Sequence, residues 1–138
     1  MYDYYRDEKC LLCLIDNGKI YYIIVQREPE LKHTGKSVIS RILLNKHKFI
    51  GDFYATQSYF MVKYIDDNYI KYDEMYKGSD RNEITTEELY RYLNGDEYNY
   101  MYVYDVSTDT LTIKTPDTGC FVIDFHETDR VEEILDRI

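Results

Sequence analysis

Tyrosine is the residue of this sequence that most clearly suits a chemical role, and that role is binding. The chain holds 17 tyrosines and no tryptophan among 138 residues. A tyrosine ring with its hydroxyl suits surfaces that are hydrated when free and buried when a partner binds. Four of these residues alternate with others along one segment, and strand geometry predicts that they share one face of a sheet: Tyr98, Tyr100, Tyr102 and Tyr104.

Two interpretations of this tyrosine segment stay open. If Met101 and Val103 face the core, the four rings face outward and are available to a partner. If the rings face the core, Asn99 and Asp105 lie outside, as a half-solvated strand requires. Val106 extends the tyrosine side and favours the second interpretation slightly.

Cysteine offers redox or zinc chemistry, and the sequence contains one CxxC pair, Cys10 and Cys13. A redox pair requires a helix N-terminus, and structural zinc requires two further ligands at suitable spacing. Here the pair lies in an apolar run that predicts a strand, where residues three apart point to opposite faces. We therefore expect core packing. Because Cys120 also has apolar neighbours, all three thiols are predicted to be free and buried in a reducing, cytoplasmic compartment.

Histidine and phosphate-loop chemistry find little support. His33, His47 and His126 belong to no metal-binding or catalytic spacing, although His126 lies among carboxylates between Asp124 and Asp129. The run Thr34-Gly-Lys-Ser37 resembles the tail of a phosphate-binding loop, but Glu30 stands where that motif requires glycine. We expect no catalytic residues, no metal and no cofactor, and hence no enzyme. The basic residues Lys32, Lys36, Arg41, Lys46 and Lys48 are predicted to form one exposed face.

Charge divides the chain into unlike halves. Residues 1–70 carry ten Lys/Arg and nine Asp/Glu, whereas residues 71–138 carry seven and seventeen, so a balance of +1 and one of −10 give the net charge of −9. The acidity serves either solubility alone or contact with a basic partner. Direct binding to nucleic acid or to an anionic membrane is disfavoured, because no basic stripe is present. No run suggests a signal peptide or a membrane span.

The order of expected elements predicts a single α+β domain over residues 1–138. A hairpin is expected at 9–16 and 19–26 around Asn17-Gly18, and a helix at 36–46. Strands are expected at 49–56, 58–65 and 68–76, with a turn at 66–68. A capping box at Thr85 and Glu88 starts a second helix that Asn94-Gly95 ends in a left-handed cap. Strands at 98–106, 110–115 and 120–125 precede a helix at 128–137. The predicted sheet is mostly antiparallel, with about three helices packed on it.

These features together predict a small acidic protein that blocks a basic nucleic-acid-binding protein or nuclease. Its size, its charge and its lack of motifs resemble phage-encoded anti-defence inhibitors, including DNA mimics and anti-CRISPR proteins. An immunity protein that neutralises a toxin nuclease, a non-catalytic subunit of a larger assembly and an unrecognised enzyme stay open as alternatives, and so does a homodimer. The residues expected to bind the partner are Tyr69, Tyr72, Asp73, Glu74, Tyr76, Glu87, Glu88, Asp96, Glu97, Tyr98 and Tyr100.

Overall fold

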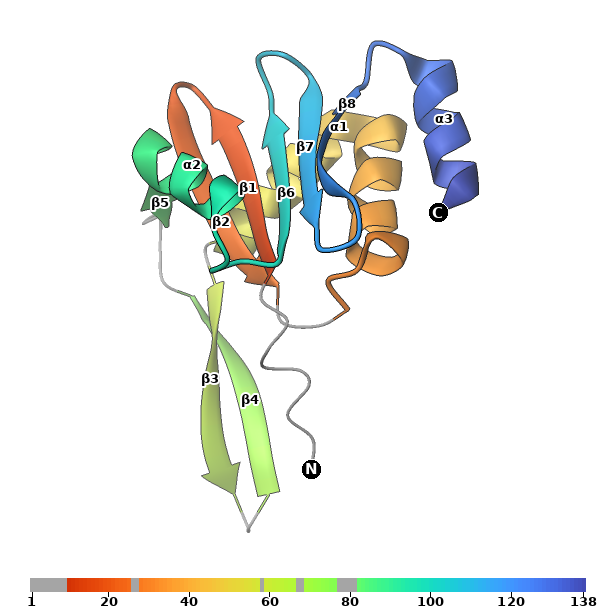
Figure 1. The fold of residues 1–138 in the computed structure, drawn as a ribbon. Helices are drawn as coiled ribbons and strands as arrows, with labels where there is room; N and C mark the ends of the chain where they lie inside the picture. Colours follow the sequence, from red (N-terminus) through yellow and green to blue (C-terminus); the bar gives the residue numbers. More distant parts are fainter. Residues whose placement is uncertain (1–9, 26–27, 58, 67–68, 77–81) are drawn as a thin grey trace.

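A computed structural model describes residues 10–25, 28–57, 59–66, 69–76 and 82–138, with the backbone alone for 59–66 and 69–76. Figure 1 shows one large sheet with helices on both sides and a separate hairpin that extends from the end of the first long helix. The elements in chain order are β1 (Cys10–Asp16), β2 (Lys19–Val25), the π-helical turn η1 (Leu31–Gly35), α1 (Lys36–Gln57), β3 (Tyr59–Asp66), β4 (Tyr69–Tyr76), β5 (Glu83–Ile84), α2 (Thr86–Asn94), β6 (Tyr100–Asp105), β7 (Thr110–Thr115), β8 (Gly119–Asp124) and α3 (Thr128–Arg137).

The six strands of the large sheet lie in the order β5-β2-β1-β6-β7-β8. Four of its neighbouring pairs are antiparallel, as predicted, but β1 and β6 at the centre are parallel, with Cys10 opposite Tyr100. The sheet is therefore mixed, because two antiparallel units, β5-β2-β1 and β6-β7-β8, meet side by side. The hairpin β3-β4 forms a second sheet of its own.

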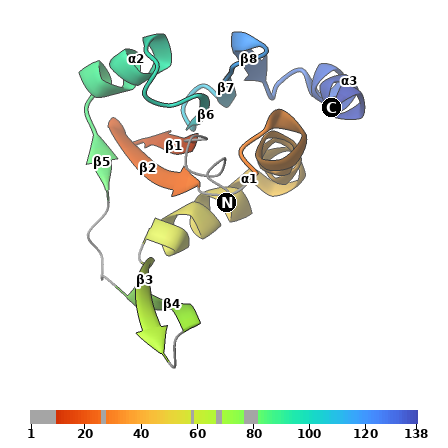
Figure 2. The same ribbon diagram turned by 60° about the horizontal axis from the view of Figure 1, so that its bottom comes forward.

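Helices cover the two faces of the sheet unequally, as Figure 2 shows. On one face, α1 and α3 bury the larger core, which contains Ile39, Phe53 and Val131 together with Tyr102 and Tyr104 of β6. On the other face, α2 packs Leu89 against Leu11, Cys13, Met101 and Val103. Both faces of β1 and β6 are therefore buried, which explains why these strands lack a polar side.

The predicted hairpin of β1 and β2 is confirmed. Asn17 and Gly18 have φ angles of 54° and 76°, which fit a type I′ turn, and Asp16 pairs with Lys19 across it. Both strands keep to the predicted ranges within the described residues.

The strand predicted at 49–56 is wrong, because α1 continues through Gln57. Phe49, Phe53 and Gln57 are buried at a spacing of four residues, which is the period of a helix and not of a strand. The helix is interrupted at Asn45, whose φ of −162° is extended. There the side-chain oxygen of Asn45 accepts a 3.1 Å bond from the backbone N–H of Lys48, so it caps the second half of α1.

The second half of α1 leads into the β3-β4 hairpin. The strands predicted at 58–65 and 68–76 are confirmed to within a residue, while residues 67–68 of the predicted turn lie outside the described residues. At the helix end, the amide of Gln57 donates to the carbonyls of Tyr22 and Asn82, at 3.0 and 3.1 Å. These bonds hold the end of α1, where the β3-β4 hairpin begins, against β2 and Asn82.

The two remaining helices have the predicted positions. Thr85 and Glu88 form both bonds of the capping box of α2. Gly95 follows the helix as expected, but its φ of −111° is extended, so no left-handed cap forms. The apolar stripe of α3 packs on the larger core, with Val131 buried and Ile134, Leu135 and Ile138 partly buried.

Candidate partner-binding surface

The tyrosines of β6 belong to the core. Tyr102 and Tyr104 have no exposed surface; the hydroxyl of Tyr102 donates to the carbonyl of Pro29 at 2.6 Å, and that of Tyr104 donates to Asp109. Tyr100 is half-buried on the same face. The expectation that all four rings share a face is wrong, because β6 begins at Tyr100 and Tyr98 packs on the α2 side. Of the two interpretations, the one in which the rings face the core is therefore correct for Tyr100, Tyr102 and Tyr104.

An acidic surface surrounds α2. Segment 82–98 contains five carboxylates and one cation, and Glu87, Asp96 and Glu97 are exposed without an ion pair to any described residue. Glu88 is half-exposed and is held by the capping box, where the backbone N–H of Thr85 keeps the pKa of its carboxyl below the usual value. We name Glu87, Glu88, Tyr90, Asp96 and Glu97 the α2 surface.

Tyrosine rings border these carboxylates. Tyr90, which was not among the predicted site residues, is 60% exposed. Its exposure follows from sequence spacing, because Leu89 and Leu93 lie on the sheet-facing stripe and leave Tyr90 outside. Tyr98 packs edge-to-face on Tyr92 with ring centroids 4.9 Å apart, and the Arg91 guanidinium lies 5.1 Å from the Tyr92 ring.

Lys114 fixes the C-terminal end of α2 to the sheet. Its ammonium, carried by β7, donates to the carbonyls of Tyr92 at 2.7 Å and Gly95 at 2.6 Å. A cation at this end of a helix satisfies unpaired carbonyls and opposes the negative end of the helix dipole. Nothing in the sequence indicates this pairing, because Lys114 looks like an ordinary solvent-facing residue of an alternating strand.

Some of the residues predicted to bind a partner do not belong to the α2 surface. Tyr100 lies on the opposite face of the sheet from α2. The residues predicted on β4 pair along their backbone with β3, but their side chains lie outside what the structure describes: Tyr69, Tyr72, Asp73, Glu74 and Tyr76. Of the predicted set, the structure thus places Glu87 and Glu88 in the first turn of α2 and Asp96, Glu97 and Tyr98 just after its end.

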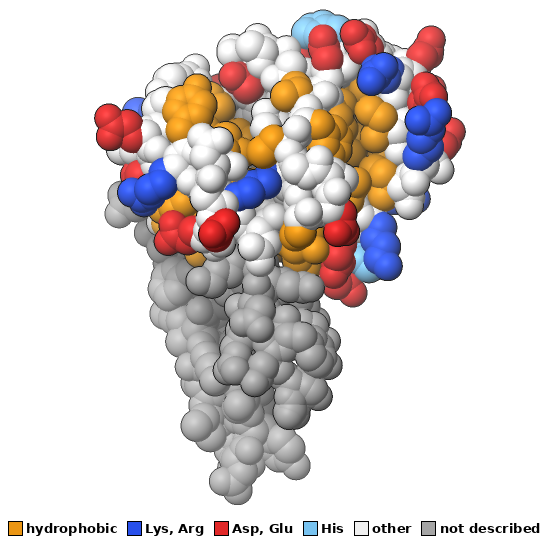
Figure 3. Space-filling model, in the orientation of Figure 1, with side chains coloured by type: hydrophobic (Ala, Val, Ile, Leu, Met, Phe, Trp, Pro, Cys, Tyr) orange, Lys and Arg blue, Asp and Glu red, His pale blue; other side chains and the backbone are white. Residues whose placement is uncertain are grey.

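Figure 3 shows the α2 side of the molecule. Carboxylates, in red, gather over α2 on the left of the view and along α3 on the right. Between them, apolar atoms are visible toward β7, β8 and α3. The carboxylates of this view are therefore not confined to α2.

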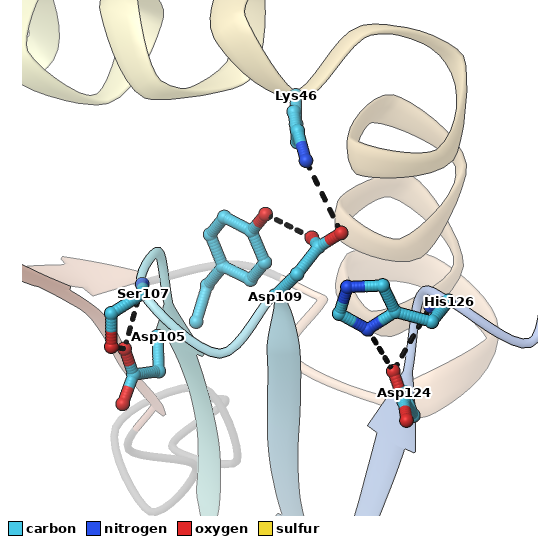
Figure 4. A network of polar contacts seen from close by, with 7 residues as sticks. Lys46, Asp105, Ser107, Asp109, Asp124 and His126 are labelled. Carbon is cyan, nitrogen blue, oxygen red and sulfur yellow. Dashed lines mark hydrogen bonds and ion pairs between the residues drawn. The ribbon is translucent and has the colours of Figure 1, made fainter.

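A second polar cluster ties α1 to the β6-β7 turn (Figure 4). Asp109 accepts from the Tyr104 hydroxyl and lies 3.2 Å from the Lys46 ammonium, next to the interruption of α1. Burial and the bond to Asp109 raise the pKa of Tyr104, so its phenol stays protonated near neutral pH. Nearby, Asp124 accepts from the backbone N–H of His126, which keeps the pKa of its carboxyl below the usual value, and lies 2.8 Å from the His126 ring. We interpret the contacts of Asp109 with Tyr104 and Lys46 as structural, because they hold α1 to the β6-β7 turn.

The residues that resemble a phosphate-binding loop are already helical. Gly35 ends η1, and its backbone N–H donates to the carbonyl of Glu30 at 3.3 Å. A side chain at this position would meet Leu31 at 2.7 Å and Tyr102 at 3.1 Å, so packing accounts for the glycine. The adjoining cavity, of about 580 Å³, has Lys32, Lys36 and Arg41 among its lining residues. All five residues of the predicted basic face are exposed.

The cysteines divide between core and surface. Cys10 and Cys13 are buried on opposite faces of β1, as predicted, whereas the prediction for Cys120 is wrong because this thiol is exposed on β8. Its neighbours Phe121 and Val122 are apolar, but only the last turn of α2 reaches this part of the sheet, where the Leu93 carbonyl lies 3.9 Å from the Cys120 thiol. Within the described residues, no group of three or more His, Cys, Asp or Glu could hold a metal ion.

No known protein family, curated protein or solved structure matches this chain. Among the described helices, none has both the length and the apolar character needed to cross a bilayer.

Proposed function

We propose that this protein is a non-catalytic inhibitor whose α2 surface occupies a basic site on a nucleic-acid-binding protein or nuclease. The observation that carries the proposal is a set of three exposed carboxylates on and just after α2, Glu87, Asp96 and Glu97, none of which forms an ion pair with a described residue; the same helix carries the exposed ring of Tyr90. Carboxylates in such an arrangement can take the place of phosphates in a basic groove, and a tyrosine ring supplies an anchor with few rotatable bonds.

The anchoring of α2 supports this proposal. The capping box holds its first turn and Lys114 holds its last turn, so Glu87 lies on an anchored helix, and Asp96 and Glu97 follow directly after its anchored end. A rigid surface loses little conformational entropy when it binds. Long-range attraction between an acidic surface and a basic groove accelerates association, and salt weakens it.

The first experiment captures partners from a native host lysate on immobilised protein at low and at high salt. We expect a nucleic-acid-binding protein or nuclease that high salt releases. The purified partner should then lose its bound nucleic acid to this protein in competition, because both occupy the same groove. A partner that binds both ligands at once would contradict the proposal.

Charge reversal localises the contact. The triple variant Glu87→Lys, Asp96→Lys and Glu97→Lys should slow association with the purified partner by roughly ten-fold or more, and should reduce the salt dependence. The matched control is Asp129→Lys, Glu132→Lys and Asp136→Lys on the exposed side of α3. Three reversals of two charges each bring both variants from −9 to −3. Both sets also contain one residue of a first helical turn, Glu87 or Asp129. Equal effects of the two variants would assign the attraction to net charge and remove the α2 surface from the proposal.

A further inference from the structure

The two edges of the six-stranded sheet are built differently. The edge strand β5 is two residues long, and its Glu83 lies 3.7 Å from Lys19 of β2. The other edge strand, β8, is six residues long and has no charged residue from Gly119 to Ile123. Proteins protect sheet edges against other strands with short length, charge, proline or a bulge. The β5 edge has such protection, and the β8 edge has none of these along its first five residues.

The β8 edge is open to an incoming strand. Among the described strands, only β7 pairs with β8, so half of the backbone N–H and C=O groups of β8 point away from the sheet. α3 follows β8 but packs on the α1 face through Val131, and so does not take the place of a further strand. On the opposite face, Val122 is 61% exposed. The outer side of β8 therefore offers hydrogen bonds and apolar surface together.

A segment that pairs with the outer side of β8 must be an extended strand, and its charge affects whether it can pair there. Although the chain carries a net charge of −9, β8 is uncharged from Gly119 to Ile123, so two copies of this stretch can pair without like charges opposite each other. We propose that β8 pairs antiparallel with β8 of a second copy, so that the two sheets join into one. This inference goes beyond the proposed function and does not depend on it.

Symmetry fixes the register of this pairing. A two-fold axis perpendicular to the sheet keeps each face continuous, so residues opposite each other must point to the same face and the axis must pass through a residue. With the axis at Val122, Phe121 faces Ile123 of the second copy on the α1 side. On the other side the two Val122 side chains meet. Asp124 then lies opposite Cys120 of the second copy, which keeps the two Asp124 carboxylates at opposite ends of the pairing.

The dimer leaves the α2 surface free. The apolar side of α2 packs over Leu11, Cys13 and Ile20 on β1 and β2. Only the last turn of α2 reaches β8, where the Leu93 carbonyl lies 3.9 Å from the Cys120 thiol on the face of the sheet, whereas the proposed pairing uses the outer edge of β8. A dimer therefore presents two copies of the α2 surface, and loss of the dimer leaves each one intact.

Light scattering after size exclusion tests the proposal on the wild-type chain. We expect the mass to rise from one chain toward two as the concentration increases from the micromolar to the millimolar range. A single-chain mass at every concentration would overturn the proposal, and so would a dimer that the following substitutions leave unchanged.

Val122→Lys should return the protein to the single-chain mass, because it places two ammonium groups together on the axis. Since Val122 is exposed in one copy, circular dichroism and the thermal midpoint should stay close to wild type. The matched control is Thr112→Lys, which changes the charge equally at the half-exposed β7 residue that pairs with Val122. This control should remain dimeric. A dimer in Val122→Lys as stable as in wild type would contradict the register and the edge.

Cross-linking tests the register directly. In a Cys120→Ser background, Val122→Cys should form a disulfide-linked dimer under mild oxidation, because a residue on a two-fold axis faces its own copy. Thr112→Cys, one strand further from the axis, should remain monomeric on a non-reducing gel. Equal cross-linking of both variants would indicate random collision and would overturn the proposed pairing.

Discussion

At the scale of single residues, Lys114 shows how one side chain replaces an expected backbone cap. Asn94-Gly95 predicts a left-handed helix end, yet Gly95 is extended and the Lys114 ammonium takes the free carbonyls of Tyr92 and Gly95. Local sequence predicts where the helix stops. It does not predict which donor binds the free carbonyls at that end, because Lys114 comes from a strand about twenty residues later in the chain.

Substitution of this lysine should cost measurable stability. Lys114→Met keeps the aliphatic chain but leaves two carbonyls without their charged donor, so we expect a loss of about 2–3 kcal/mol in the free energy of unfolding. Urea denaturation measures it. The control Lys48→Met removes a lysine whose side chain is 72% exposed beside Asp52, for which we expect a loss of about 0–1 kcal/mol. Equal losses would contradict the anchoring role of Lys114.

The buried thiols should give the protein a sensitivity to alkali. Burial raises the pKa of Cys10 from 9.0 to about 12 and raises that of Cys13 as well. Their contribution to stability is complete below pH 9 and is lost as the pH rises toward 12, because the unfolded chain releases protons that the folded chain retains. Urea midpoints should therefore fall above pH 9. Unchanged midpoints between neutral pH and pH 11 would contradict this prediction.

Thiol labelling separates the three cysteines at neutral pH. A chromogenic disulfide reagent should label exposed Cys120 at once and should label Cys10 and Cys13 only after denaturation. In Cys120→Ser, the fast phase should vanish. A fast phase that persists in this variant would place a reactive thiol in β1 and contradict its burial.

At the scale of elements, sequence predicts those whose signals are local. The type I′ turn at Asn17-Gly18 and the capping box at Thr85 are short motifs, and both are confirmed. Residues 49–56 were predicted as a strand because aromatic and β-branched residues dominate there, whereas Phe49 and Phe53 have helical spacing. The pairing of β1 with β6 has no local signal, because nothing in either segment identifies its neighbour.

The capping box provides a test at this scale. Thr85→Ala removes the acceptor of the Glu88 backbone N–H, and we expect a loss of about 0.5–2 kcal/mol in the free energy of unfolding. Thr86→Ala changes an exposed threonine one position later, inside the helix, and should have little effect. Urea denaturation of both variants gives the comparison. A loss confined to Thr86→Ala would show that the cap is not what stabilises α2.

The residues of the candidate surface, like the elements, could be predicted only where the sequence signal is local. Charged side chains at helix ends are expected to be exposed, so Glu87 in the first turn of α2 and Asp96 and Glu97 just after its end could be found from sequence. The tyrosines could not be assigned in this way, because an amphipathic ring fits either face of a strand. Tyr102 and Tyr104 are in the core, where their hydroxyls donate to the carbonyl of Pro29, which is distant in the chain, and to Asp109 in the adjoining turn.

At the scale of the whole molecule, helices cover the two faces of the sheet unequally, and the α2 surface and the β8 edge lie on different parts of it. Both faces of β1 and β6 are buried, while on the α2 face only the last turn of that helix reaches β7 and β8, through Lys114 and Cys120. The first turn of α2 and the outer side of β8 therefore lie on different parts of one sheet. This arrangement lets partner binding and self-association be measured by separate variants.

The central parallel pair has a consequence for how the chain folds. Cys10 pairs with Tyr100, so the middle of the sheet closes only after the 89 residues between them are in place. Contacts between such distant residues slow folding. At synthesis rates of about 5–20 residues per second, β1 must wait on the order of 5–20 s on the ribosome for its neighbour. A chain that ends at Glu97 should therefore show no cooperative unfolding in urea, and its apolar first hairpin is the segment that a chaperone would protect during this interval.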